Sequence, residues 1–191
     1  MSTDDANHLV GQQFPLVALP STTGQTIGPR EFASGSFVLF SYPRTSRPDQ
    51  TQSPEWALVP RAKGCTPEAC EFRDLAADYA VLGYRIYGLS SQDTDDQSEA
   101  AKRLHLPYPV LSDPEFVLAN ALGLPTFGFD GELLHTRSTL VVRDRIITHA
   151  YFGILDAAAH ARDLLERLHQ GSSMRQSNCA TASFSDQIPS W

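Results

Sequence analysis

The stretch "GCTPEACEFRD", Gly64 to Asp74, contains two of the three cysteines of this 191-residue chain, and they stand five positions apart. The text continues as "LAADYA", and an apolar stripe at helical spacing runs through the segment: Phe72, Leu75, Ala76 and Tyr79. Proline is tolerated in a helix only in its first turn, so Pro67 places the helix start within a residue or two of Cys65. The sequence therefore predicts a helix over residues 66–80 with Cys65 at its N-terminal end.

A cysteine at a helix start lies where unsatisfied backbone N–H groups and the positive end of the helix dipole converge. That environment favours thiolate over thiol. Lowering a thiol pKa from about 8.5 to about 6 would raise the thiolate fraction at neutral pH from a few per cent to roughly nine-tenths. We therefore expect the pKa of Cys65 to be lowered and its sulfur to be nucleophilic.

Helical phase separates the two cysteines. Cys65 falls on the face of the apolar stripe, whereas Cys70 falls on the more polar side with Arg73 and Asp74. Five helical residues turn about 140° and rise about 7.5 Å, which puts the two Cα atoms about 8.7 Å apart. A disulfide needs Cα atoms within about 7 Å. If these thiols pair, the first turn of the helix must unwind first.

Other readings of the cysteines are open at this point. Both could be small buried apolar residues. Zinc is disfavoured, because the chain has six histidines and none stands in a short metal-type spacing with another or with the cysteines: His8, His105, His135, His149, His160 and His169. There is no G-x-S-x-G, Walker or dinucleotide-type glycine loop. We expect neither a metal nor a cofactor.

The composition excludes several classes of function. The chain is 41% hydrophobic and 19% charged, which is typical of a globular domain. Its net charge of −7, without a basic run, argues against nucleic-acid binding. No apolar run approaches the roughly 18 residues that cross a membrane. The start, "MSTDDANHLV", lacks signal-peptide features, so we expect a cytoplasmic protein whose paired cysteines are redox-active rather than structural.

Strands and helices alternate along the chain. The expected elements are a β-hairpin within residues 10–32, strands at 36–42, 84–91 and 108–113, helices at 93–105 and 116–122, two strands around a turn at 143–145, and a helix at 156–170 closed by Gly171. Alternation predicts a mixed α/β sheet with parallel members, and the final tight turn makes the last pair antiparallel. The polar text from Ser172 on, with Cys179, is expected to be a disordered tail.

The motif "GCTPEACEFRD", preceded by "FVLFSYPR" and "VGQQFPLVALPSTTGQTI", resembles the bacterioferritin-comigratory (Q-type) atypical two-cysteine branch of the peroxiredoxins, in the AhpC/TSA family. "YRIYGLSSQD", "LPYPVLSDPE" and "RSTLVV" follow in the family's order. The resemblance implies a thioredoxin-like fold over residues 8–170, with a mixed central sheet, flanking helices and an N-terminal β-hairpin. Residues 46–63 would be a loop insertion and 171–191 the tail.

The resemblance also implies the chemistry. Cys65 would be the peroxidatic residue, which attacks hydrogen peroxide or an organic hydroperoxide and becomes a sulfenic acid. Cys70 would be the resolving residue, which converts the sulfenic acid to an intramolecular disulfide. Thioredoxin or a glutaredoxin-like dithiol would restore the thiols. Because resolution within one chain needs no second subunit, a monomer or weak dimer is expected.

Three further site residues are carried over from the family. Arg137, in "HTRSTLVV", would stabilise the thiolate and the peroxide, although its spacing alone favours a solvated strand-end cation. Pro43 would be the shielding proline. The family motif Pro-x-x-x-Thr-x-x-Cys is broken here, since Ala62 stands three residues before Cys65. Either Thr45 (or Ser46) supplies the peroxide-binding hydroxyl from across the insertion, or that hydroxyl is absent.

The segment from Pro43 to Gly64 is too rich in proline and polar residues to predict regular structure. We interpret its Trp56 as a clamp on the neighbouring surface, and expect the insertion to lie over the mouth of the site and to move when the cysteines bond. The alternative function is a non-enzymatic redox sensor or thiol-binding module of the same fold. A copper chaperone is disfavoured, because it would want cysteines four apart.

Overall fold

The computed structural model describes residues 6, 8–48, 53–59 and 64–182. Its centre is a five-stranded mixed sheet in the order β5-β4-β3-β8-β9. The strands are β3 (Ser36–Ser41), β4 (Tyr84–Ser90), β5 (Val110–Ser112), β8 (Ser138–Arg143) and β9 (Ile146–Phe152). β3 runs parallel to β4, and β4 to β5, while β3–β8 and β8–β9 are antiparallel. The expected mixed sheet is confirmed.

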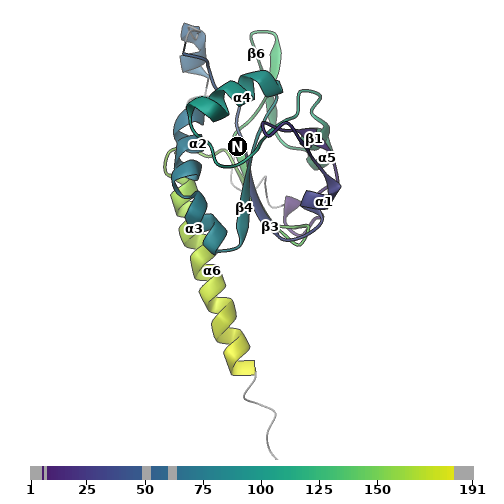
Figure 1. Cartoon of the computed structure of the whole chain (residues 1–191), viewed down its shortest axis with the longest axis vertical. Helices are drawn as coiled ribbons and strands as arrows, with labels where there is room; N and C mark the ends of the chain where they lie inside the picture. The colour runs from purple at the N-terminus through teal and green to yellow at the C-terminus, as the bar shows by residue number, and fades with distance from the viewer. Residues whose placement is uncertain (1–5, 7, 49–52, 60–63, 183–191) are drawn as a thin grey trace, which may run out of the picture.

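The central strand β3 supplies the core on both faces of the sheet. Successive side chains of a strand point to opposite faces, so Val38 and Phe40 enter one buried cluster and Phe37 and Leu39 the other. The first cluster lies under helices α2, α3 and α6, and the second under α1, α5 and the N-terminal segment (Figure 1). A strand buried on both faces reads as a continuous apolar run, which is why "SFVLFS" predicts it.

Several shorter elements follow the sequence prediction. The opening hairpin pairs β1 (Leu19–Pro20) with β2 (Thr26–Ile27). Helices α4 (Thr94–Arg103) and α5 (Val117–Leu122) match the two expected helices, whereas α1 (Pro29–Phe32) lies within the stretch predicted as a hairpin. The side chain of Asp93 caps α4 by accepting the N–H of Asp96 at 2.8 Å.

The predicted helix over 66–80 is two helices, α2 (Cys65–Asp74) and α3 (Ala76–Val81), which meet at Leu75. The predicted helix start at Cys65 is correct. The break is invisible to the apolar periodicity, because both helices pack the same stripe against the sheet.

A second hairpin, β6 (Thr126–Phe129) with β7 (Glu132–His135), is not among the expected elements. Its turn is Asp130–Gly131, with φ of 52° and 78°. Asp-Gly at positive φ is the sequence that a two-residue hairpin turn requires. The dipeptide was therefore a readable signal, and it bears on the site because β7 leads to Arg137.

The C-terminal helix α6 runs from His160 to Ala182, so the predicted start at Asp156 and end at Gly171 are both wrong. Asp156 instead closes a turn by accepting the N–H groups of Ala158 and Ala159. Gly171 lies inside α6 and does not have the positive φ with which a glycine ends a helix. The end of α6 projects beyond the sheet and its other helices (Figure 1). The division into a domain at 8–170 and a tail stays a prediction.

No helix in the described part of the chain combines the length and the apolar character needed to cross a membrane.

Candidate active site

Cys65 is the first residue of α2, and the residue before it must be glycine. Gly64 has a φ of +100°, which L side chains rarely adopt. A Cβ atom there would lie 2.8 Å from the Cβ of Ala157, in the loop between β9 and α6. The close approach seats the tip of α2 against the segment that leads into α6.

Strand pairing brings Arg137 to Cys65 from 72 positions further along the chain. Ser41 pairs with Ser138, so the residue just before β8 lies beside the end of β3. The Nη2 atom of Arg137 lies 3.4 Å from the Sγ of Cys65. The backbone N–H of Arg44, just past β3, also donates to that sulfur. Two donors thus converge on the cysteine at the helix tip.

Glu68 lies beside Cys65 and Arg137 as a third member of the site, and the sequence patterns did not predict it. It lies one helical turn after Cys65 and is fully buried, and its Oε2 accepts a hydrogen bond from Nη1 of Arg137. The signal was available, because residues three apart share a helix face and Cys65 was already assigned to the buried face. A carboxyl group in that position must be buried with the sulfur.

Burial raises the pKa of the Cys65 thiol, which corrects the expectation drawn from the helix start. The Arg137 guanidinium and the Arg44 N–H lower this pKa, and Glu68 raises it further. Burial also raises the pKa of Glu68, to about 8, against the lowering effect of Arg137. The physical reason is that the free energy needed to remove each anion from water exceeds the stabilisation that the neighbouring charge and hydrogen-bond donors give it.

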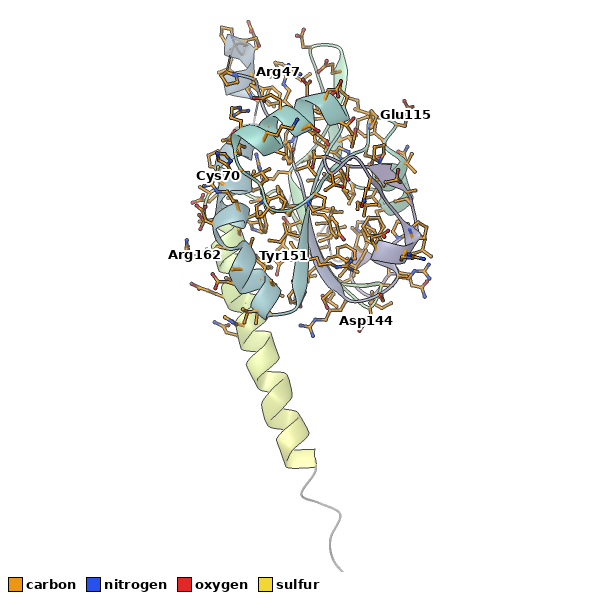
Figure 2. The ribbon with its side chains drawn as sticks, in the orientation of Figure 1. Arg47, Cys70, Glu115, Asp144, Tyr151 and Arg162 are labelled. Carbon is orange, nitrogen blue, oxygen red and sulfur yellow. The ribbon has the colours of Figure 1, made fainter. Side chains whose placement is uncertain are left out.

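Cys70 lies on α2 five residues after Cys65, and the two cysteines are not joined by a disulfide. It is half-buried at the outer edge of the molecule (Figure 2). Cys65, by contrast, is buried in the core cluster under α2, α3 and α6. This matches the predicted difference in helical phase. Nearby, the hydroxyl of Tyr108 donates to the carbonyl of Ala69 at 2.6 Å, which fixes α2 against the core.

Pro43 and Thr45 follow β3 and are both buried. The carbonyl of Pro43 accepts a hydrogen bond from Ser90 at 3.0 Å. The backbone N–H of Thr45 donates to Oε1 of Gln92 at 2.7 Å, and its hydroxyl donates to the same atom at 3.3 Å. Gln92 therefore holds the Thr45 hydroxyl, and a peroxide-binding role for Thr45 stays a prediction.

The insertion contains a 3₁₀ helix, Pro54–Leu58, where no regular structure was predicted. Its Trp56 is 2% exposed and packs edge-on against Phe129 of β6, with ring centroids 5.0 Å apart. Arg44 stacks on Trp56 at 4.3 Å and pairs with Glu132 of β7 at 3.2 Å. The clamp predicted for Trp56 is confirmed. Residues 49–52 and 60–63, with Ala62, lie outside the described residues, and a position of the insertion over the site stays a prediction.

Trp56 is expected to report disulfide formation. Arg44 touches Cys65 through its backbone and Trp56 through its side chain, so unwinding the tip of α2 should disturb the indole and change its emission. A Trp191→Phe background leaves Trp56 as the fluorophore, and Cys70→Ser in that background is the control that cannot form the bond. Identical spectra for reduced and oxidised protein, with the bond confirmed by mass, would contradict the coupling.

The fold and this cysteine site together define a redoxin, and the Redoxin family model matches residues 9–165. A putative peroxiredoxin of Mycobacterium tuberculosis is 31% identical over 156 residues, which cover 78% of this chain and 89% of the relative. The chain therefore belongs to the Redoxin family and, within it, to the peroxiredoxins of the bacterioferritin-comigratory (Bcp/Q) type.

Two further comparisons agree. Peroxiredoxin bcp1 of Schizosaccharomyces pombe is 31% identical over 120 residues, which are 62% of this chain and 54% of the yeast protein. The crystal structure of the peroxidoxin BcpB from Mycobacterium tuberculosis is similar at a TM-score of 0.68 and 29% identity, covering 84% of this chain and 96% of that one.

Proposed function

We propose that this chain is a thiol-dependent peroxidase that reduces hydrogen peroxide and organic hydroperoxides at Cys65. The observation that carries the proposal is the Arg137 guanidinium 3.4 Å from a buried cysteine sulfur at a helix tip. The thiolate attacks the terminal peroxide oxygen, the O–O bond breaks, and the sulfur is oxidised to a sulfenic acid. The leaving oxygen takes up a proton and departs as water or an alcohol. Arg137 stabilises the negative charge that moves from sulfur to oxygen.

The second step is resolution by Cys70. Its thiolate attacks the sulfenic sulfur, water leaves, and a Cys65–Cys70 disulfide forms. Because Cys65 and Cys70 lie in one continuous helix, we infer the order of events in this step. Cα atoms about 8.7 Å apart in a helix are beyond the roughly 7 Å that a disulfide spans, so the first turn of α2 opens before the bond forms.

A thioredoxin or glutaredoxin-like dithiol reduces the disulfide and returns the two thiols. The protein acts in the cytoplasm as a monomer or weak dimer, because both cysteines of the cycle belong to one chain.

Cys70→Ser is expected to spare a single turnover and then stall as a Cys65 sulfenic acid, because the attacking thiol is missing. The measurement is mass spectrometry after one equivalent of peroxide, with a sulfenic-acid-trapping reagent. In the parent protein the same peptide map should show Cys65 joined to Cys70. A parent map that joins Cys65 to Cys179, or full turnover of Cys70→Ser with a dithiol protein as reductant, would overturn the assignment.

A non-enzymatic redox sensor or thiol-binding module of the same fold is the second candidate. It is favoured by the alanine at position 62, where the family has its threonine, and by the Thr45 hydroxyl being held by Gln92. Stopped-flow mixing with peroxide separates the two functions. A peroxidase consumes peroxide catalytically, whereas the sensor reacts negligibly and is found in mixed disulfides through Cys70.

A further inference from the structure

Two acids and one guanidinium form a buried cluster at the tip of α2. Cys65 is 5% exposed, Glu68 0% and Arg137 1%. Each terminal nitrogen of Arg137 donates to one of these two acids: Nη1 donates to Glu68 and Nη2 donates to Cys65. The same positive charge therefore faces two groups that can each become an anion.

The carboxyl group of Glu68 is incompletely satisfied. Its Oε2 has Arg137, but its Oε1 is buried and has no hydrogen-bond partner among the described residues. Burying a carboxylate oxygen without a hydrogen-bond partner destabilises the folded state. Protonation of the carboxylate removes its negative charge and so reduces this destabilisation. The pKa of Glu68, raised to about 8 by burial, agrees with a carboxyl group that holds a proton at neutral pH.

We propose that Glu68 and Cys65 share one proton across Arg137, so that Glu68 acts as a positioning residue that holds the proton when Cys65 is the thiolate. The exchange is Cys65–SH with Glu68–COO⁻ going to Cys65–S⁻ with Glu68–COOH. An S–H bond breaks, an O–H bond forms, and the total charge of the cluster stays the same. With one proton between them, the buried site holds one negative charge against the guanidinium in either form. It holds none at lower pH, where both groups are protonated, and two only at higher pH.

The other titratable groups around the cluster keep their charge near neutral pH. Tyr42 and Tyr108 face Glu68, and burial raises the pKa of both hydroxyls, so they stay protonated. His160 lies near Arg137, and burial lowers its pKa to about 4, so it stays neutral. Among the described residues, the proton exchange therefore concerns Cys65 and Glu68.

The titration of Cys65 tests the sharing directly. Two strongly interacting acids lose their protons in two macroscopic steps that belong to the pair. In a Cys70→Ser, Cys179→Ser background, the ultraviolet absorbance of the Cys65 thiolate should therefore rise in two steps with pH. Adding Glu68→Gln should leave a single step and complete the rise at a lower pH, by on the order of one unit, because the competing anion is gone.

Glu71→Gln is the matched control. Glu71 lies on the same helix, but its carboxylate pairs with Arg162 at 2.7 Å, at the edge of the molecule (Figure 2). Its replacement should leave the two steps unchanged. A one-step titration while Glu68 is present overturns the proposal, and this measurement needs no change at Glu68. An equal shift from Glu71→Gln also overturns it.

The inference deepens the proposed function, since the shared proton sets how much nucleophile is present for peroxide. The two can fail separately. A two-step titration with no reaction toward peroxide would refute the peroxidase and leave the shared proton standing. Peroxide reduction with a one-step titration would do the reverse.

Discussion

Cys65→Ser is expected to lower peroxide consumption by at least about 10⁴-fold, to the rate of protein-free solution. The serine hydroxyl is not ionised near neutral pH, and its oxygen cannot be oxidised as sulfur can. The loss should therefore be complete at every pH at which the fold persists. Stopped-flow measurement of hydrogen peroxide with excess thioredoxin and its reductase gives the rate.

Cys179→Ser is the control for that experiment and should keep the parent rate, because Cys179 lies in the last turn of α6, far along the chain from Cys65. Circular dichroism and thermal unfolding confirm that each variant is folded. Parent-level turnover by Cys65→Ser would refute the peroxidase assignment to this sulfur.

Arg137→Gln is expected to lower the rate with peroxide at neutral pH by about 10²–10³-fold. The amide keeps hydrogen-bonding capacity but removes the positive charge, so both the thiolate and the departing oxygen lose stabilisation. The guanidinium lowers the pKa of Cys65, so its removal should move the pH–rate profile to higher pH. The measurement is the second-order rate with peroxide as a function of pH.

Removing this arginine also leaves Glu68 buried without its cation. The pKa of Glu68 is already raised, so the folded state binds the proton more tightly than the unfolded chain does. Without Arg137 that difference grows, and the free energy of unfolding should fall as the pH rises above the ordinary carboxyl range. Adding Glu68→Gln removes the buried acid and should restore the stability without restoring the rate, which separates catalysis from folding.

Arg143→Gln is the matched control on the same strand. Arg143 ends β8, and its Nε donates to the hydroxyl of Tyr84 at 2.7 Å, away from Cys65. Its variant should react with peroxide at the parent rate. If the two arginine variants lose the same activity, the loss reflects the stability of the sheet and the role assigned to Arg137 is wrong.

Local signals along the chain determined the helix tip and the central strand. Pro67 and the apolar stripe located the start of α2 at Cys65, because a proline and a helical period act over a few residues. The run at 36–42 identified β3 for the same reason. The Asp130–Gly131 turn was an equally local signal of the hairpin that carries the Trp56 contact.

The contents of the site depended on tertiary structure. Arg137 reaches Cys65 because β3 pairs with β8, and its spacing alone favoured a solvated cation. Burial, which raises the pKa of Cys65 and encloses Glu68, is a property of the packed cluster rather than of the helix end. Sequence patterns report interactions between neighbours in the chain, whereas desolvation and long-range charge pairing arise only when distant segments meet.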